Sequence, residues 1–164
     1  MEVGKIYEYA LQREREGRDF FRSSAGRFGH AAVSDVFEKL ALEEEKHIQF
    51  IQGLLAGLDQ GGSSGLEVGK AFDQAGFFST RADSEMLDQT VIEAMVPDLT
   101  VLRMAYLIER DFAEFYEMAA ERSGDDRAKK SLSMLAKWER QHEKLFKRLH
   151  DRAFEEYAGM PWGG

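Results

Sequence analysis

The chain has 164 residues, of which 43% are hydrophobic and 32% are charged, a composition typical of one globular domain. Its 30 acidic residues outnumber its 22 basic residues, and the net charge of −8 argues against binding to nucleic acid or to an anionic membrane surface. The absence of cysteine excludes disulfide bonds, thiolate zinc sites and iron–sulfur clusters. No apolar run is long enough for a signal peptide or a membrane span, so we expect a soluble, cytoplasmic protein.

Two long stretches that are almost free of glycine and proline predict four long helices. The first stretch, residues 2–58, is interrupted only near 26–29, and the last, residues 98–157, only near 123–126. Each stretch therefore predicts two helices joined by a short turn, which makes each pair antiparallel. Asp98 directly follows Pro97 and is expected to cap the third long helix.

Roughly 40 residues connect the two helix pairs. Residues 59–69 are rich in glycine and serine and predict a loop, whereas residues 84–95 have the apolar spacing of a short helix. So long a connection is uncommon inside a compact domain, but it can run the whole length of a bundle. The sequence therefore predicts an all-α four-helix bundle made of two antiparallel helix hairpins with a long crossover. We expect the domain to span 1–157, followed by a C-terminal tail, 158–164.

A glutamate interrupts the apolar stripe of each long helix near its middle. In the second and fourth helices a histidine follows that glutamate three residues later, on the same face. The six interrupting residues are Glu14, Glu44, His47, Glu109, Glu139 and His142.

The two halves of the chain place these residues in the same way. Glu14 and Glu44 are 30 residues apart, as are Glu109 and Glu139, and each midpoint falls on a glycine of a predicted turn. Each glutamate is thus about 22 Å from its turn at 1.5 Å per residue, so partner carboxylates lie at the same height. The second half repeats the first at an offset of 95 residues, which indicates an internal duplication of a helix hairpin.

Four carboxylates in an apolar core need compensation, because burying even one unpaired carboxylate costs several kcal/mol. Arg18 is the only cation near the middle of the stripes. Two divalent metal ions would balance the charge, and Glu and His three residues apart can reach one ion. Carboxylate and imidazole together suit Fe, Mn or Zn better than Mg or Ca. The alternative is a buried, hydrogen-bonded Glu/His network without metal.

Neighbouring residues have simpler interpretations. Tyr106 and Tyr116 share the face of the third-helix glutamate, and we favour core packing for both over a redox role or support of the metal ligands. Glu43 and Glu45 flank the second-helix glutamate and are expected to be solvated.

At these positions the sequence resembles the rubrerythrin branch of the ferritin-like superfamily. The resemblance rests on EREGRDFF at 14–21, LALEEEKH at 40–47, ERDFAEFY at 109–116 and LAKWERQH at 135–142. It implies a ferritin-like bundle with terminal ligands Glu14 and Glu109, bridging ligands Glu44 and Glu139, and one terminal histidine per metal, His47 and His142. It also implies two Fe ions, oxidation of ferrous iron by O₂ or peroxide, and a homodimer.

The chain departs from rubrerythrins in two ways. It lacks the cysteines of a rubredoxin domain, so we expect an external electron donor. It also has Phe112 where rubrerythrins place a further glutamate one turn after the third-helix ligand, and Gly17 at the equivalent position of the first helix. We expect a di-iron oxidoreductase of the oxidase or peroxidase type, acting in oxidative-stress or iron chemistry. The alternatives are an iron-handling ferroxidase or storage protein, and a metal-stabilised structural bundle without turnover.

Overall fold

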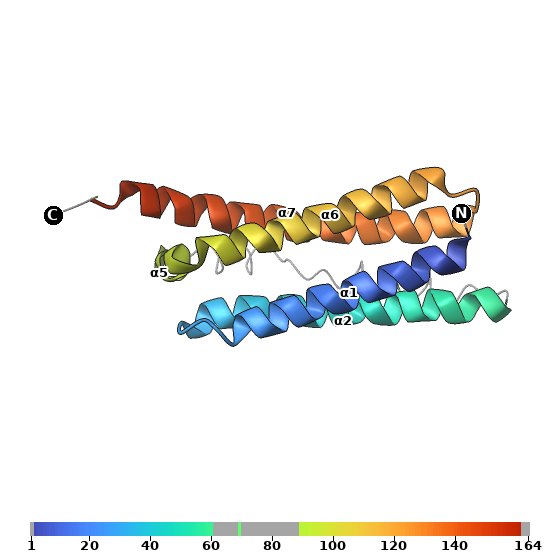
Figure 1. Ribbon diagram of the computed structural model, residues 1–164, viewed down its shortest axis with the longest axis horizontal. Helices are drawn as coiled ribbons and strands as arrows, with labels where there is room; N and C mark the ends of the chain where they lie inside the picture. Colours follow the sequence, from blue (N-terminus) through green and yellow to red (C-terminus); the bar gives the residue numbers. More distant parts are fainter. Residues whose placement is uncertain (1, 61–68, 70–88, 162–164) are drawn as a thin grey trace.

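Four long helices form two antiparallel hairpins in the computed structural model, which describes residues 2–60, 69 and 89–161 (Figure 1). The first hairpin consists of α1 (Val3–Ala25) and α2 (Ala31–Gln60), and the second of α6 (Leu99–Arg122) and α7 (Asp126–Gly159). Within each hairpin the two helices pack along one another, and α1 also contacts α6. The predicted all-α bundle of two helix hairpins is confirmed.

Two helices have an aspartate at the N-cap position, but only one of the two side chains makes a capping hydrogen bond. Asp125 precedes α7 in extended backbone, and its side chain accepts a hydrogen bond of 2.7 Å from the backbone N–H of Ala128. Asp98 occupies the N-cap position of α6, as predicted, but its side chain makes no capping hydrogen bond. The reason is local, because Asp98 ends a short 3₁₀ turn, η1 (Val96–Asp98), and lacks the extended backbone that directs a capping side chain.

The crossover was predicted as a loop followed by a short helix. Helix α2 continues through Gln60, so residues 59 and 60 are helical and not part of a loop as predicted. Residues 61–68 of the predicted loop lie outside the described chain. The short helix is observed as α5 (Gln89–Met95), whose Val91 and Met95 are buried, while 84–88 lie outside the described residues. At Gly69 an added Cβ would lie 2.6 Å from Cε2 of Phe50, so the backbone passes too close for any side chain.

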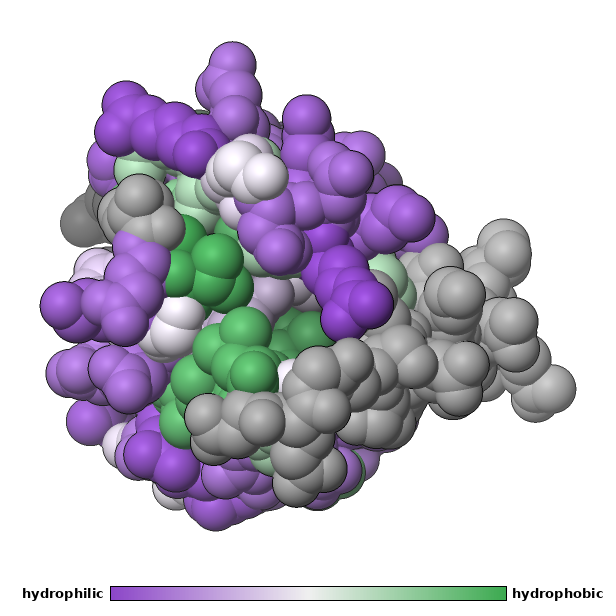
Figure 2. Space-filling view, turned by 90° about the vertical axis from the view of Figure 1, so that its right-hand side faces the viewer, coloured by the Kyte–Doolittle hydropathy of each residue, from purple (hydrophilic) through white to green (hydrophobic). Residues whose placement is uncertain are grey.

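Two apolar cores fill the bundle, one on each side of its middle. The buried residues of one core include Phe21, Phe37, Leu40 and Phe146. Those of the other include Phe50, Tyr116, Leu135 and Trp138. An end-on view shows hydrophobic side chains gathered between the helices and hydrophilic ones around them (Figure 2). Among the described residues, no helix combines the length and apolar character needed to cross a membrane. On every long helix the segment between the two cores carries the polar residues described next.

Candidate metal centre

All six residues predicted from the stripes meet in the layer between the two cores. Helices α1 and α6 each provide one glutamate, and α2 and α7 each provide a glutamate and a histidine. Each glutamate is 0% exposed and each histidine 3%, so the whole cluster is shielded from bulk water. The members are Glu14, Glu44, His47, Glu109, Glu139 and His142. Helical periodicity brings them inward because each glutamate continues the buried stripe of its own helix.

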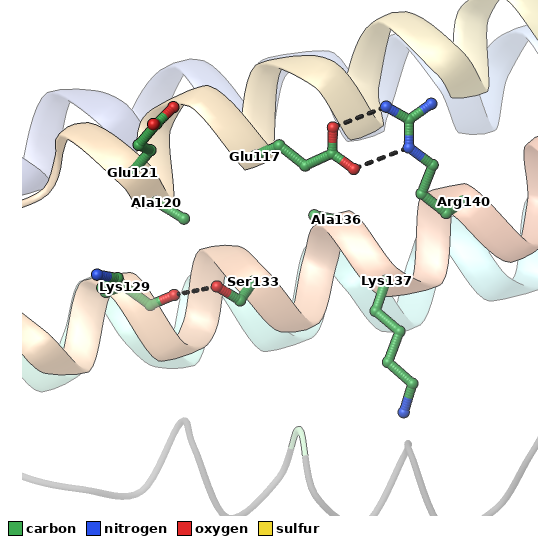
Figure 3. A pocket seen from close by; sticks show the side chains of 8 residues that line it. All are labelled: Glu117, Ala120, Glu121, Lys129, Ser133, Ala136, Lys137 and Arg140. Carbon is green, nitrogen blue, oxygen red and sulfur yellow. Dashed lines mark hydrogen bonds and ion pairs between the residues drawn. The ribbon is translucent and has the colours of Figure 1, made fainter.

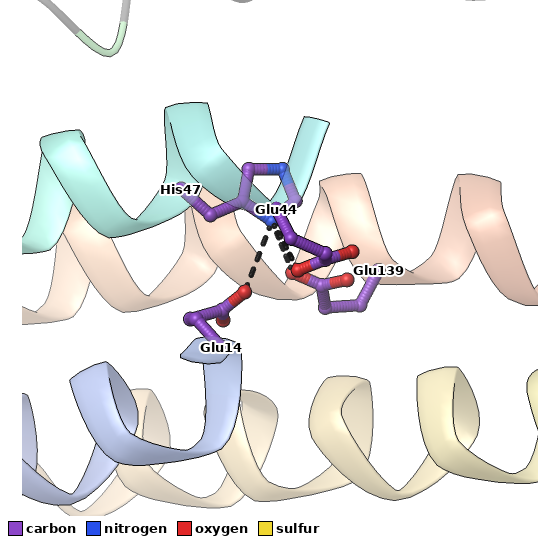
Figure 4. A group of neighbouring side chains, drawn as sticks. All are labelled: Glu14, Glu44, His47 and Glu139. Atoms are coloured by element: carbon purple, nitrogen blue, oxygen red, sulfur yellow. Dashed lines mark hydrogen bonds and ion pairs between the residues drawn. The ribbon is translucent and has the colours of Figure 1, made fainter. Parts of the chain in front are cut away.

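His47 is the centre of the first group of ligand atoms (Figure 4). Its Nδ1 lies 2.9 Å from Oε1 of Glu139, 3.2 Å from Oε2 of Glu14 and 3.3 Å from Oε2 of Glu44. A single imidazole nitrogen therefore faces three carboxylates that come from three different helices.

His142 is the centre of a second group with the same composition. Its Nδ1 lies 3.3 Å from Oε2 of Glu139, 3.4 Å from Oε1 of Glu44 and 3.5 Å from Oε2 of Glu109. The two imidazole rings are nearly parallel, with their centroids 5.3 Å apart. The two groups therefore lie side by side, as the duplicated sequence pattern requires.

Two glutamates belong to both groups. Glu44 and Glu139 each direct one carboxylate oxygen toward His47 and the other toward His142, whereas Glu14 and Glu109 each face one histidine. In each group of four residues the ligand atoms all lie within 4.8 Å of one another, so each group could hold a metal ion. The arrangement is that of two adjacent sites with two shared carboxylates.

The protons of the cluster are strongly redistributed by burial and by its own charges. Burial raises the pKa of Glu14 and Glu109 well above the ordinary carboxyl value, and the neighbouring carboxylates raise it further. Burial would raise the pKa of Glu44 and Glu139 as well, but the facing histidines hold both below the ordinary value. The carboxylates in turn raise the pKa of His47 and His142 well above the ordinary imidazole value, although burial alone would lower it.

The buried oxygens indicate what the cluster lacks. Within the described residues, neither carboxylate oxygen of Glu44, Glu109 or Glu139 makes a hydrogen bond. Buried polar atoms without a hydrogen-bond partner are rare in folded proteins and indicate a place for a bound water or ion. Hard carboxylate oxygens together with imidazole nitrogens form a donor set that suits Fe, Mn or Zn. The residues present therefore fit the metal pair that the resemblance implies.

Tyr116 has a more specific role than the predicted core packing. It is completely buried on α6, and its hydroxyl group donates a hydrogen bond to Oε1 of Glu14 across the bundle. Burial raises the pKa of this phenol well above its ordinary value, so it remains a donor. Tyr106 instead packs edge-on against His150, with ring centroids 5.4 Å apart. The sequence pattern placed Tyr116 on the same helix face as Glu109, but it did not indicate that Tyr116 would bond to Glu14.

Two charged neighbours differ from expectation. Glu43, predicted as solvated, is only 9% exposed, and its carboxylate accepts a hydrogen bond from Lys46. Glu45 is half-buried and pairs with Arg18 at 3.0 Å. Arg18 also pairs with Asp19 at 2.8 Å, so both of these acidic partners lie at the surface and not in the cluster. This arginine therefore does not supply the charge that the buried carboxylates need.

A second concave region lies on the outer face of α6 and α7 (Figure 3). It has a volume of about 460 Å³, and Ala120 and Ala136 are the small residues that line it. Arg140 and Glu117 close one side through two parallel hydrogen bonds of 2.7 and 2.8 Å. The rim of this pocket contains both acidic and basic side chains, and none of the six cluster residues lines it. We therefore assign this pocket no function.

Comparison with known proteins agrees with this geometry. The family model described as Rubrerythrin matches residues 5–150, a region that contains all six cluster residues. No curated protein and no solved structure matches the chain.

Proposed function

Because the chain belongs to the rubrerythrin family, we propose that it is a non-haem di-iron oxidoreductase that reacts with O₂ or H₂O₂. The observation that carries this proposal is the pair of buried groups that share Glu44 and Glu139. In the ferritin-like fold, such a set of four glutamates and two histidines is the ligand arrangement of a dinuclear metal centre.

We assign each residue a role from its position in the two groups. Glu44 and Glu139 would bridge the two ions because each faces both histidines. Glu14 with His47 and Glu109 with His142 would complete one ion each, because each of these pairs belongs to only one of the two groups. Bound iron would supply the electron transfer to the oxidant.

The remaining chemistry belongs to the protein itself. Tyr116 donates its hydroxyl hydrogen to Glu14 and so orients that carboxylate toward His47. The apolar cores on both sides exclude water from the cluster, which strengthens its electrostatic interactions. Without cysteine the chain has no iron–sulfur centre of its own, so we propose that an external donor returns electrons, and that the protein acts as a homodimer.

Metal analysis followed by a redox cycle tests the proposal. After anaerobic loading with Fe(II), we expect two iron ions per chain, and stoichiometric H₂O₂ should oxidise both. An external reductant should then restore the ferrous form. Glu43→Gln is the matched control, because Glu43 adjoins Glu44 and is buried but belongs to neither group.

The possible outcomes separate the functions. Fewer than one ion per chain would contradict the metal centre, and bound iron that never changes oxidation state would favour a structural bundle. Ferric iron that leaves the site after oxidation, in a hollow assembly, would favour iron storage.

A further inference from the structure

We propose that Gly17 and Phe112 form the position through which small exogenous ligands reach the cluster, and that the Phe112 ring sets their size limit. The inference rests on the proposed function, since it concerns ligands of the bound metal ions. Gly17 and Phe112 each lie three residues after a cluster glutamate, on α1 and α6, and therefore one helical turn further along the same inward face.

The absence of a side chain at Gly17 leaves room next to a shared carboxylate. A Cβ added there would lie 3.9 Å from the carboxyl carbon of Glu44 and 3.1 Å from Cε2 of Phe112. The edge of the phenyl ring therefore occupies the place that a side chain on α1 would take. Between the Phe112 ring and the Glu44 carboxylate, α1 contributes only backbone.

The other face of the same ring is directed toward the surface. The guanidinium carbon of Arg13 lies 4.9 Å from the centroid of the Phe112 ring, and the Arg13 side chain is 35% exposed. Phe112 itself is 3% exposed. One aromatic ring thus separates the partly solvated guanidinium of Arg13, which also pairs with Glu16 at 3.4 Å, from the buried cluster.

Two further aromatic side chains cover the cluster at His47. The indole of Trp138 stacks on His47 with centroids 5.1 Å apart, and Phe50 packs edge-on against that indole at 5.2 Å. The flank at Glu14 is held by the Tyr116 hydrogen bond. Along the bundle axis, the two apolar cores cover the cluster at its two ends. Phe112 thus lies between Gly17, which has no side chain, and the partly exposed Arg13, so its displacement would connect the cluster with the surface near Arg13.

Azide binding to the Co(II)-loaded protein measures this access without any turnover. Stopped-flow changes in the Co(II) absorption give the azide association rate. Phe112→Leu should raise that rate roughly three- to tenfold, the factor that corresponds to moving one side chain out of its rotamer. Gly17→Ala should lower it by a similar factor, because the new methyl group fills the remaining space between the ring and Glu44.

A size test makes the role of the ring specific. Phe112→Ala removes a phenyl group beside the cluster, so benzoate should bind its Co(II) ions and perturb their spectrum, whereas the unchanged protein should not respond to benzoate. Phe146→Leu is the control. Phe146 is also a buried phenylalanine, but it belongs to the other apolar core, which does not contain Phe112. This variant should destabilise the fold without changing the azide rate. If Phe112→Ala does not fold, the opposite rate changes of the two milder variants remain the test.

Equal azide rates in the unchanged protein, Phe112→Leu and Gly17→Ala would overturn the inference while leaving the metal centre intact. A folded Phe112→Ala protein that loads Co(II) but ignores benzoate would overturn the size limit. Failure of the unchanged protein to bind Co(II) would contradict the metal centre itself and, with it, this inference.

Discussion

The affinity of the cluster for metal ions should depend steeply on pH, and so should the folding stability of the metal-free protein. In the metal-free cluster, the raised pKa values leave protons on Glu14, Glu109, His47 and His142. Glu44 and Glu139 stay ionised because their pKa values are lowered. Two protonated histidines and two ionised glutamates cancel, so protons perform the charge compensation that metal ions would otherwise provide.

The number of protons displaced by metal follows from this inventory. Metal ligands must be ionised carboxylates and neutral imidazoles, so two divalent ions should release one proton from each of Glu14, Glu109, His47 and His142. Two protons are then released per ion. The apparent affinity for each ion should therefore rise up to about 100-fold for each unit of increasing pH, which is about 2.7 kcal/mol of binding free energy. The full effect is expected only at pH values below all four raised pKa values.

The stability of the metal-free protein should change in the opposite direction. A group whose pKa is raised on folding holds more protons in the folded than in the unfolded state, so its contribution is lost as pH rises through the folded pKa. The window opens above the ordinary value of 4.5 for Glu14 and Glu109 and above 6.5 for the two histidines. Above that value, each group lowers the folding stability by about 1.4 kcal/mol per unit of rising pH, until the pH reaches its pKa in the folded protein. Glu44 and Glu139 act oppositely, but only below 4.5.

Calorimetric titration in two buffers of different ionisation enthalpy measures the proton release, and thermal melts with and without chelator measure the stability. We expect up to four protons per chain, the number approaching four as the pH falls below the raised pKa values, and a metal-free protein that melts lower at pH 8 than at pH 6. The Glu14→Gln variant should release one proton fewer. Release below one proton per chain, or chelator-treated and metal-loaded melts that coincide at pH 8, would refute the reasoning.

Three further predictions concern single positions. Glu44→Gln should reduce bound iron toward zero because both ions lose a ligand, whereas Glu14→Gln should leave about one ion per chain; equal retention by elemental analysis would contradict the bridging role. Asp125→Ala should cost about 1 kcal/mol of unfolding free energy in urea because a capping bond is lost, while Asp98→Ala should cost little, and the reverse order would show that the caps are misassigned. Diferrous protein mixed with excess peroxide should oxidise once and stop without a donor, with His47 bound in both oxidation states, because Phe112 cannot replace it as a ligand; repeated turnover in stopped flow, or a structure with His47 displaced, would disprove this.

Local sequence pattern was sufficient for the helices and for the identity of the six cluster residues. Helical period assigns each residue to a face from sequence alone, and a glutamate on an apolar stripe is conspicuous because burial of its charge is costly. The equal spacing from Glu14 to Glu44 and from Glu109 to Glu139 placed the carboxylates at one height, since the rise per residue is constant. No contact between distant segments was needed for these inferences.

Tertiary structure decided how these residues meet. Which glutamates face both histidines depends on the rotation and separation of four helices, and no spacing along one helix contains that information. The same holds for the Tyr116 hydrogen bond to Glu14, whose partners are 102 residues apart. It also holds for the ring of Phe112 beside Gly17, where a side chain of one hairpin fills a gap in the other. Asp98 and Asp125 differ for a related reason, because backbone geometry imposed by the preceding turn decides whether an aspartate can reach the helix end.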